Sequence, residues 1–210
     1  MPMKLNDREY REIRVAELEV REEQDGRRIV EGYATTFDQE YRLYGDAHYE
    51  VYESVGRNAF DGADMADVIM QYDHEGRVFA RKSNGTLELA TDEHGLKIRA
   101  DLGGTELGRQ LYEEIKGGYT TKMSFGFSVK KSERREERDE TTGKIVAHRK
   151  ITEIRKLYDV SAVSLPANDA TEISARYIGE GVIGDIKQEL LAMEARERKK
   201  TQIAIMAQTI

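Results

Sequence analysis

Short runs of alternating apolar and polar residues recur along most of this chain, and glycine, asparagine or aspartate separates one run from the next. Alternation with a period of two is typical of a β-strand that buries one face. Only two prolines, Pro2 and Pro166, occur in 210 residues, so the turns depend on the 18 glycines and on Asn and Asp. This pattern favours a mainly β fold over a parallel α/β sheet.

Two hairpins are predicted in the first half. The turn pair Asp25-Gly26 precedes a strand at Arg28–Phe37 and makes that strand the partner of the run before it. The earlier run changes phase between Val15 and Leu18, which indicates a β-bulge. A second hairpin is expected around the turn at Asp92–Gly95.

The second half is predicted to begin with a helix followed by a strand with two different faces. Thr105 is typical of a helix N-cap, and Gly117-Gly118 of a helix end. The strand, Thr120–Lys130, carries Met123, Phe125, Phe127 and Val129 on one face, and Ser124, Gly126 and Ser128 on the other. So sparse a face lets a bound peptide approach closely, or lets a larger element of the same chain pack there.

Charged residues fill Lys130–Glu140, where ten of eleven side chains are charged. We expect this run at the solvated tip of a hairpin, followed by strands at Lys144–Ile154 and Leu157–Ser164. With the earlier runs, these give a mainly β, α+β fold class. The predicted architecture is an antiparallel β-barrel of about seven strands flanked by a few helices.

Helical character marks the C-terminal segment. An apolar stripe of barely two heptads has members at i, i+3, i+7 and i+10, namely Ile183, Ile186, Leu190 and Met193. It suits packing against the barrel as well as binding to a partner. We predict a barrel domain at 1–175 and a helical tail at 176–210.

Composition excludes several classes of function. Without cysteine there are no disulfides, zinc–thiolate sites, iron–sulfur clusters or cysteine nucleophiles, which suits a reducing compartment. A net charge of −7 argues against a nucleic-acid partner. No apolar run approaches the roughly 20 residues of a membrane span, and Met1–Tyr10 lacks the apolar stretch of a secretory signal. We therefore expect neither nucleic acid nor membrane as a partner.

Three residues are candidates for chemistry. His74 closes a run that passes from apolar to polar, where a strand end would present its ring at a sheet edge. Ser124 lies on the sparse strand face. Asp159 interrupts a strand-like run, and a carboxylate there needs an imidazole or a basic side chain to offset its desolvation. Each of the three, taken alone, also fits a purely structural role.

Three segments, in order, resemble the prohead protease family of tailed phages, capsid-maturation serine proteases related to herpesvirus assemblin. They are Gln71–Glu75, Met123–Phe127, and Asp159–Val163 followed by Pro166-Ala167. The similarity spans about residues 10–175 and implies a β-barrel of about seven strands with flanking helices. It implies that Ser124 is the nucleophile, His74 the general base and Asp159 the third member of a triad.

The resemblance leaves two assignments open. His148, 24 residues after Ser124 on an expected strand, competes with Asp159 as the third member. The arginines associated with the assemblin oxyanion hole would fall near Ala167 and Asn168, neither of which is basic. Backbone N–H groups at these two positions could donate instead, as backbone donors do in other proteases.

The function that the resemblance implies is serine endopeptidase activity without a metal or other cofactor. Its substrate would be the scaffold segment of the major capsid protein, and also the protease itself, in the host cytoplasm inside the assembling prohead. The tail at 176–210 would then be self-cleaved or assembly-directing, and homo-oligomerisation is left open. The alternative is a non-catalytic β-barrel that acts as an internal scaffold or capsid-assembly partner.

Overall fold

The computed structural model describes residues 8–13 and 18–164, with seven further residues between 184 and 199. The described part has eleven strands, one α-helix (α1, Glu106–Lys116) and a 3₁₀ turn (η1, Lys82–Asn84). The strands are β1 (Glu9–Ile13), β2 (Glu19–Glu22), β3 (Arg28–Thr36), β4 (Tyr41–Gly45), β5 (Tyr49–Val55), β6 (Ile69–Tyr72), β7 (Glu75–Arg81), β8 (Leu87–Thr91), β9 (Gly95–Asp101), β10 (Lys122–Arg138) and β11 (Ile145–Val163).

The strands form two open sheets rather than the predicted antiparallel barrel. The larger sheet has the order β1-β10-β11-β5-β4, and β6 pairs with both β11 and β7; the smaller has the order β2-β3-β9-β8. The barrel prediction was wrong because β11 pairs in parallel with two strands in succession, first β5 and then β6. Within the described residues, neither sheet closes on itself.

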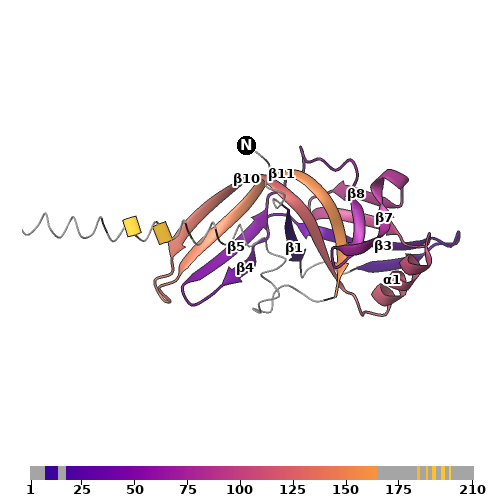
Figure 1. Cartoon of the computed structure of the whole chain (residues 1–210), viewed down its shortest axis with the longest axis horizontal. Helices are drawn as coiled ribbons and strands as arrows, with labels where there is room; N and C mark the ends of the chain where they lie inside the picture. Colours follow the sequence, from indigo (N-terminus) through magenta and orange to yellow (C-terminus); the bar gives the residue numbers. More distant parts are fainter. Residues whose placement is uncertain are drawn as a thin grey trace, which may run out of the picture.

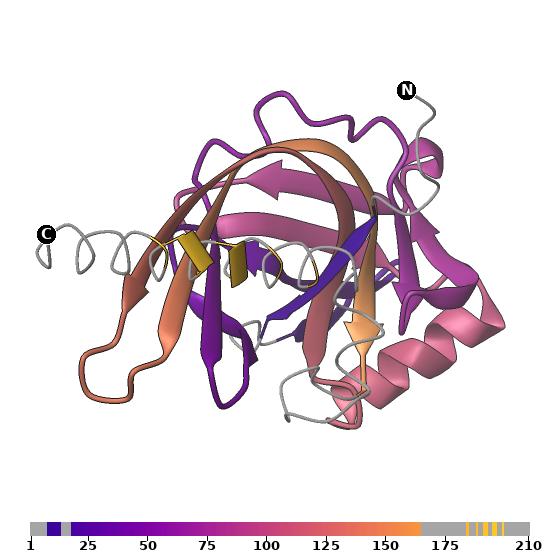
Figure 2. The same ribbon diagram turned by 60° about the vertical axis from the view of Figure 1, so that its left-hand side comes forward.

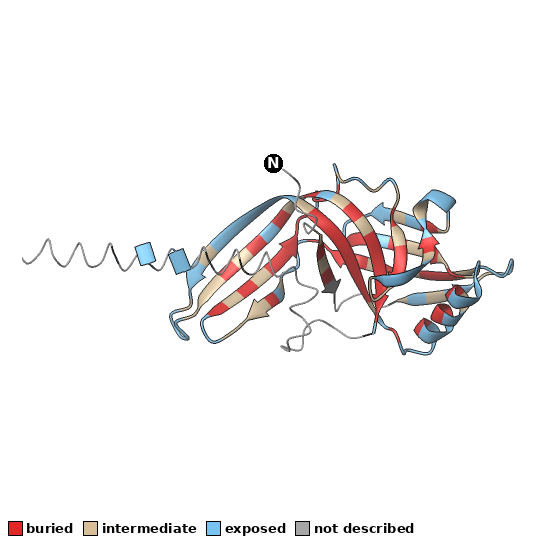
Figure 3. Cartoon of the chain, viewed as in Figure 1, coloured by how far each residue is buried: buried red, intermediate tan, exposed pale blue. Residues whose placement is uncertain are grey.

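β10 and β11 form one long antiparallel ribbon that arches across the molecule (Figure 2). The two strands predicted at Lys144–Ile154 and Leu157–Ser164 are a single strand of 19 residues, because register shifts opposite it absorb the bend without ending the pairing. Most of the charged run, up to Arg138, forms the distal half of β10, and only its last two residues, Asp139 and Glu140, lie at the hairpin tip. This half of β10, the part of β11 that pairs with β5, and the strands β4 and β5 extend away from α1 and are here called the arm (Figure 1). Along β10 the arm is largely exposed (Figure 3).

Other local predictions are confirmed, with one exception. β2 pairs with β3 and β8 with β9, both antiparallel, and the Thr105 hydroxyl accepts a hydrogen bond from Gly108 N at the start of α1. The expected bulge between Val15 and Leu18 falls outside the described residues. The runs on either side of it do not form one bulged strand, since β1 pairs with β10 in one sheet and β2 with β3 in the other.

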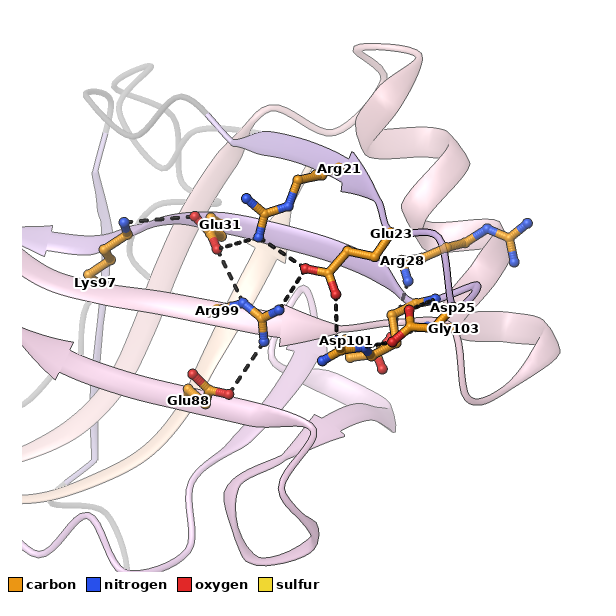
Figure 4. A network of polar contacts seen from close by, with 11 residues as sticks. Arg21, Glu23, Asp25, Arg28, Glu31, Glu88, Lys97, Arg99, Asp101 and Gly103 are labelled. Atoms are coloured by element: carbon orange, nitrogen blue, oxygen red, sulfur yellow. Dashed lines mark hydrogen bonds and ion pairs between the residues drawn. The ribbon is translucent and has the colours of Figure 1, made fainter.

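The outer face of the smaller sheet carries a network of ion pairs across neighbouring strands (Figure 4). Arg99 on β9 contacts Glu23, Glu31 and Glu88 at 3.0–3.3 Å, and Arg21 on β2 contacts Glu23 and Glu31 at 3.1 and 3.4 Å. Each exposed pair stabilises the fold by at most about 1 kcal/mol. The stability of the fold therefore comes from the core rather than from this polar surface.

The main core takes the large side chains of β10, as their alternation predicts. Met123, Phe125 and Phe127 are fully buried, and the two phenylalanine rings stack with their centroids 4.5 Å apart. α1 adds Leu111, Tyr112 and Ile115 to the buried residues. Burial of this face fixes the register of β10, and thereby fixes which residues point to the opposite face.

A second buried group is ionic and ties β1 to the arm. Arg11 on β1 donates to both carboxylate oxygens of Glu53 on β5 and to Glu9. Arg149 on β11 donates to Glu53 at 2.6 Å and to Glu9 at 2.8 and 3.1 Å, and the Tyr41 hydroxyl donates to Glu53 at 2.6 Å. Burial alone would raise the pKa of Glu53, but the charges of Arg11 and Arg149 hold it below its usual value.

We expect Glu53→Ala to lower the free energy of unfolding by about 3–5 kcal/mol, because the substitution leaves two buried guanidinium groups with Glu9 as their shared counter-ion. Urea denaturation measures the change. The control is Glu88→Ala, which removes an exposed partner of Arg99 and should change stability by no more than about 0.5 kcal/mol. Equal losses for the two variants would contradict a stabilising role for the buried cluster.

Four tyrosines lie on the β4–β5 hairpin, namely Tyr41, Tyr44, Tyr49 and Tyr52. Tyr49 packs with Leu43 and Val51 in a small satellite core.

The domain boundary at 175, the predicted tail stripe and most of 176–210 lie outside the described residues. Among the described helices, none is both long and apolar enough to cross a membrane.

Candidate active site

Three neighbouring strands bring the candidate residues together. Ser124 on β10 pairs with Ser161 on β11, and Gly126 pairs with Asp159. Residues directly opposite each other in an antiparallel pair share a face, so these four lie on the side of the sheet away from Phe125. On the other edge of β11, the parallel pairing places Gln71 of β6 beside Ser161. The chain therefore leaves β6 close to the end of β11 that carries Asp159.

His74 lies in the two-residue turn between β6 and β7. Tyr72 pairs with Glu75, and the two residues between them, Asp73 and His74, have φ angles of 47° and 60°. Positive φ at both positions matches a type I′ hairpin turn, which normally favours Asn and Gly, and non-glycine residues there cost about 1 kcal/mol or more each. The Asp73 carboxylate accepts hydrogen bonds from Ser164 N at 3.2 Å and Ser164 Oγ at 3.1 Å. The turn is thus fixed to the end of β11.

The ring of His74 lies between a hydroxyl and a carboxylate. Its Nδ1 is 2.5 Å from Asp159 Oδ1, and its Nε2 is 2.5 Å from Ser124 Oγ. A carboxylate only accepts, so Nδ1 donates to Asp159 and Nε2 is left to accept from the Ser124 hydroxyl. Ser124 and Asp159 are fully buried, and the His74 side chain is 3% exposed. This is the arrangement in which a histidine removes the proton of a serine nucleophile.

Asp159 has three side-chain partners among the described residues. Besides His74, its Oδ1 accepts a hydrogen bond from Ser161 Oγ at 2.9 Å, and its Oδ2 pairs with Arg8 Nη2. Burial alone would raise the pKa of Asp159, but the hydrogen bond and charge of His74, and then the charge of Arg8, hold it below its usual value. The carboxylate stays ionised at neutral pH and can stabilise an imidazolium on His74.

Gly126 makes room for this arrangement. A Cβ at this position would overlap Asp159 Oδ2 and would lie 2.9 Å from Tyr10 Cε1 and 3.0 Å from Arg8 Nε. The sparse face of β10 is therefore covered here by side chains of β1 and β11. At Gly126, therefore, other parts of the same chain pack on the sparse face, which was the second of the two alternatives that the sequence left open.

We expect Gly126→Ala to destabilise the protein by about 1–3 kcal/mol and to slow the reaction of Ser124 with a fluorophosphonate, because the methyl group must displace the Asp159 carboxylate. Thermal unfolding and the rate of labelling measure the two effects. Gly104→Ala is the matched control, since a Cβ there meets no atom within 4 Å. Labelling of Gly126→Ala at the wild-type rate would show that the position of the carboxylate does not matter.

Of the remaining candidates, His148 is the one that the described residues include. His148 is in the arm, where its Nδ1 is 2.9 Å from Glu40 Oε1 and its ring stacks on Tyr52. It lies on the part of β11 that pairs with β5, eleven residues from Asp159, so the structure does not bring it to Ser124. Ala167 and Asn168 lie outside the described residues. No group of three or more metal-ligating side chains occurs in the described part of the chain.

Three contributors to the site were missed by sequence analysis. The Ser161 contact was detectable in principle, since Ser161 stands two residues after Asp159 and shares its face. Arg8 and Tyr10 had no such signal, because their role depends on β1 pairing with a strand more than 100 residues away. The two partners considered for Asp159, an imidazole and a basic side chain, are both present.

A comparison with protein families matches residues 16–181 to the caudovirus prohead serine proteases. The match covers more than three quarters of the chain and includes His74, Ser124 and Asp159. The chain belongs to this family. No curated protein and no solved structure matches the chain. This is a family of serine peptidases of phage capsid maturation.

Proposed function

We propose that this protein is a serine endopeptidase that cleaves scaffold segments of the major capsid protein, and itself, during phage head maturation. Ser124 is the nucleophile, His74 the general base and Asp159 the residue that orients the imidazole. The observation that carries the proposal is the pair of 2.5 Å contacts of His74, one to Ser124 Oγ and one to Asp159 Oδ1. Family membership supports the reaction class.

The reaction follows from these contacts. Ser124 Oγ attacks the carbonyl carbon of the scissile peptide bond while its proton passes to His74 Nε2. The imidazolium, stabilised by Asp159, then gives that proton to the leaving amine, and the C–N bond breaks to leave an acyl-enzyme. Water, deprotonated by His74, releases the acyl group and regenerates the Ser124 hydroxyl. We assign the oxyanion donors to the backbone N–H groups of Ala167 and Asn168.

The proposed place of action is the interior of the assembling prohead in the host cytoplasm, where capsid protein and protease are enclosed together. The family comparison supports this assignment, since the matched family is that of the prohead proteases. The substrate is then a protein segment rather than a small molecule. A single hydroxyl nucleophile with a histidine base needs no metal or organic cofactor for this chemistry.

Co-expression with the cognate capsid protein tests the proposal. Intact-mass spectrometry should show a shortened capsid protein with the wild type and full-length capsid protein with Ser124→Ala. The same comparison shows whether the protease shortens its own chain. Unprocessed capsid protein with wild-type enzyme, in particles that still assemble, would instead favour a non-catalytic scaffold role.

A further inference from the structure

The first described strand lies against the site although it precedes the family match. β1, Glu9–Ile13, pairs with β10 in a register that sets Tyr10 opposite Gly126 and Glu12 opposite Ser124. The residues matched to the family begin at 16. The contacts that β1 and the adjacent Arg8 make with the site are therefore features of this chain beyond the matched region.

Arg8 and Tyr10 contact two members of the triad. The Arg8 guanidinium pairs with Asp159 Oδ2, the oxygen that His74 does not use, and the Tyr10 ring lies 4.3 Å from the His74 ring, centroid to centroid. The guanidinium also lies over the rings of Tyr10 and Tyr158, at 5.1 and 4.7 Å. Two aromatic faces hold Arg8 over the carboxylate, and cation–π contacts of this kind favour a fixed guanidinium.

The buried ionic cluster holds β1 in this place. On either side of Tyr10, Glu9 accepts a hydrogen bond from Arg149 on β11 and Arg11 donates one to Glu53 on β5. Removing one partner of a buried ion pair leaves an uncompensated buried charge and is strongly destabilising, so these pairs hold β1 firmly on the sheet. Arg8 thus extends from an anchored strand onto Asp159.

We propose that Arg8 is a positioning residue, which fixes the Asp159 carboxylate in the orientation that His74 requires. The inference rests on the proposed peptidase function. A carboxylate with one oxygen bound to an imidazole can rotate about χ2 and lose that contact. A second charge-assisted hydrogen bond on the other oxygen opposes this rotation. Arg8 acts through Asp159, its hydrogen-bond and ion-pair partner in the described structure, and not through Ser124.

The test compares Arg8→Gln with Arg8→Lys in the full chain, with a fluorophosphonate as the probe of serine reactivity. We expect Arg8→Gln to slow labelling of Ser124 by about ten- to a hundredfold, by analogy with the loss of an outer partner that orients a metal ligand. Arg8→Lys, which keeps a cation near Asp159 Oδ2, should recover part of the rate. Arg21→Gln removes a comparable arginine from the far sheet and should label like the wild type.

A double-mutant cycle separates positioning from folding. If Arg8 acts through Asp159, Arg8→Gln should change labelling by less than about twofold in an Asp159→Asn background, since the partner interaction is already gone. A purely structural role would slow both backgrounds equally. In this double variant the buried group at position 159 is uncharged and does not need the charge of Arg8, so the double variant remains informative if Arg8→Gln alone unfolds.

Proton NMR gives a readout independent of catalysis. The His74 Nδ1 proton, bonded to a carboxylate, should resonate well downfield of the amides in the wild type and shift or broaden in Arg8→Gln. If the wild type is not labelled, the peptidase proposal fails and the resonance alone decides the role of Arg8. The inference would be overturned if Arg8→Gln were labelled at the wild-type rate and its His74 resonance were unchanged. Faster labelling of Arg8→Gln would also overturn it, because that result would mean that β1 shields Ser124.

Discussion

Ser124→Ala, His74→Ala and the double variant are each expected to lower the rate of peptide cleavage by about 10⁶-fold, with little difference among the three. Residues that act as one unit give losses that do not add, and removing either the nucleophile or its base abolishes the same step. The three variants should fold, because Ser124→Ala removes only a hydroxyl and the turn that carries His74 keeps the hydrogen bonds that Ser164 donates to Asp73.

Cleavage of a capsid-derived peptide, followed by chromatography, measures these losses. His94→Ala is the control, since His94 lies in the exposed β8–β9 turn, where its ring contacts Tyr33. Losses that add in the double variant would mean that Ser124 and His74 act in separate processes. Cleavage by Ser124→Ala near the wild-type rate would reject Ser124 as the nucleophile.

Asp159→Asn is expected to lower turnover by about 10⁴-fold, because an amide can donate to His74 Nδ1 and thereby favour the wrong tautomer. The substitution also removes the charge that stabilises the imidazolium. Stopped assays of the same peptide measure the effect. His148→Ala should lower turnover far less, since His148 contacts Glu40 and Tyr52 in the arm. The reverse order of effects would make His148 the third member.

The parts of the fold that depend on local sequence were predictable. The turn at Asp25-Gly26, the cap at Thr105 and the alternation around Phe125 each have a short-range physical cause, and all three are present. The predicted barrel failed for a long-range reason. Parallel pairing of β11 with β5 and β6 leaves no local signal, because it depends on strands more than 80 residues away.

The candidate site divides in the same way. The sequence places Ser124 on a sparse strand face and Asp159 within a strand-like run. The hairpin turn that orients His74 toward Ser124 and Asp159 depends on two consecutive residues with positive φ. Asp73-His74 is not a typical sequence for such a turn. Arg8 could not be assigned, because its partner lies 151 residues later in the chain.

The nucleophile itself is the most direct point to measure. Trypsin cuts after Lys122 and Lys130 and releases a peptide that contains both Ser124 and Ser128. Ser128 lies on the same strand face four residues away and serves as an internal control. After reaction of the folded wild-type protein with a fluorophosphonate, fragment spectra of this peptide should place the adduct on Ser124, and His74→Ala should remain unlabelled. An adduct on Ser128 or on any serine outside this peptide, or no adduct on the folded protein, would contradict the assignment of Ser124 as the nucleophile.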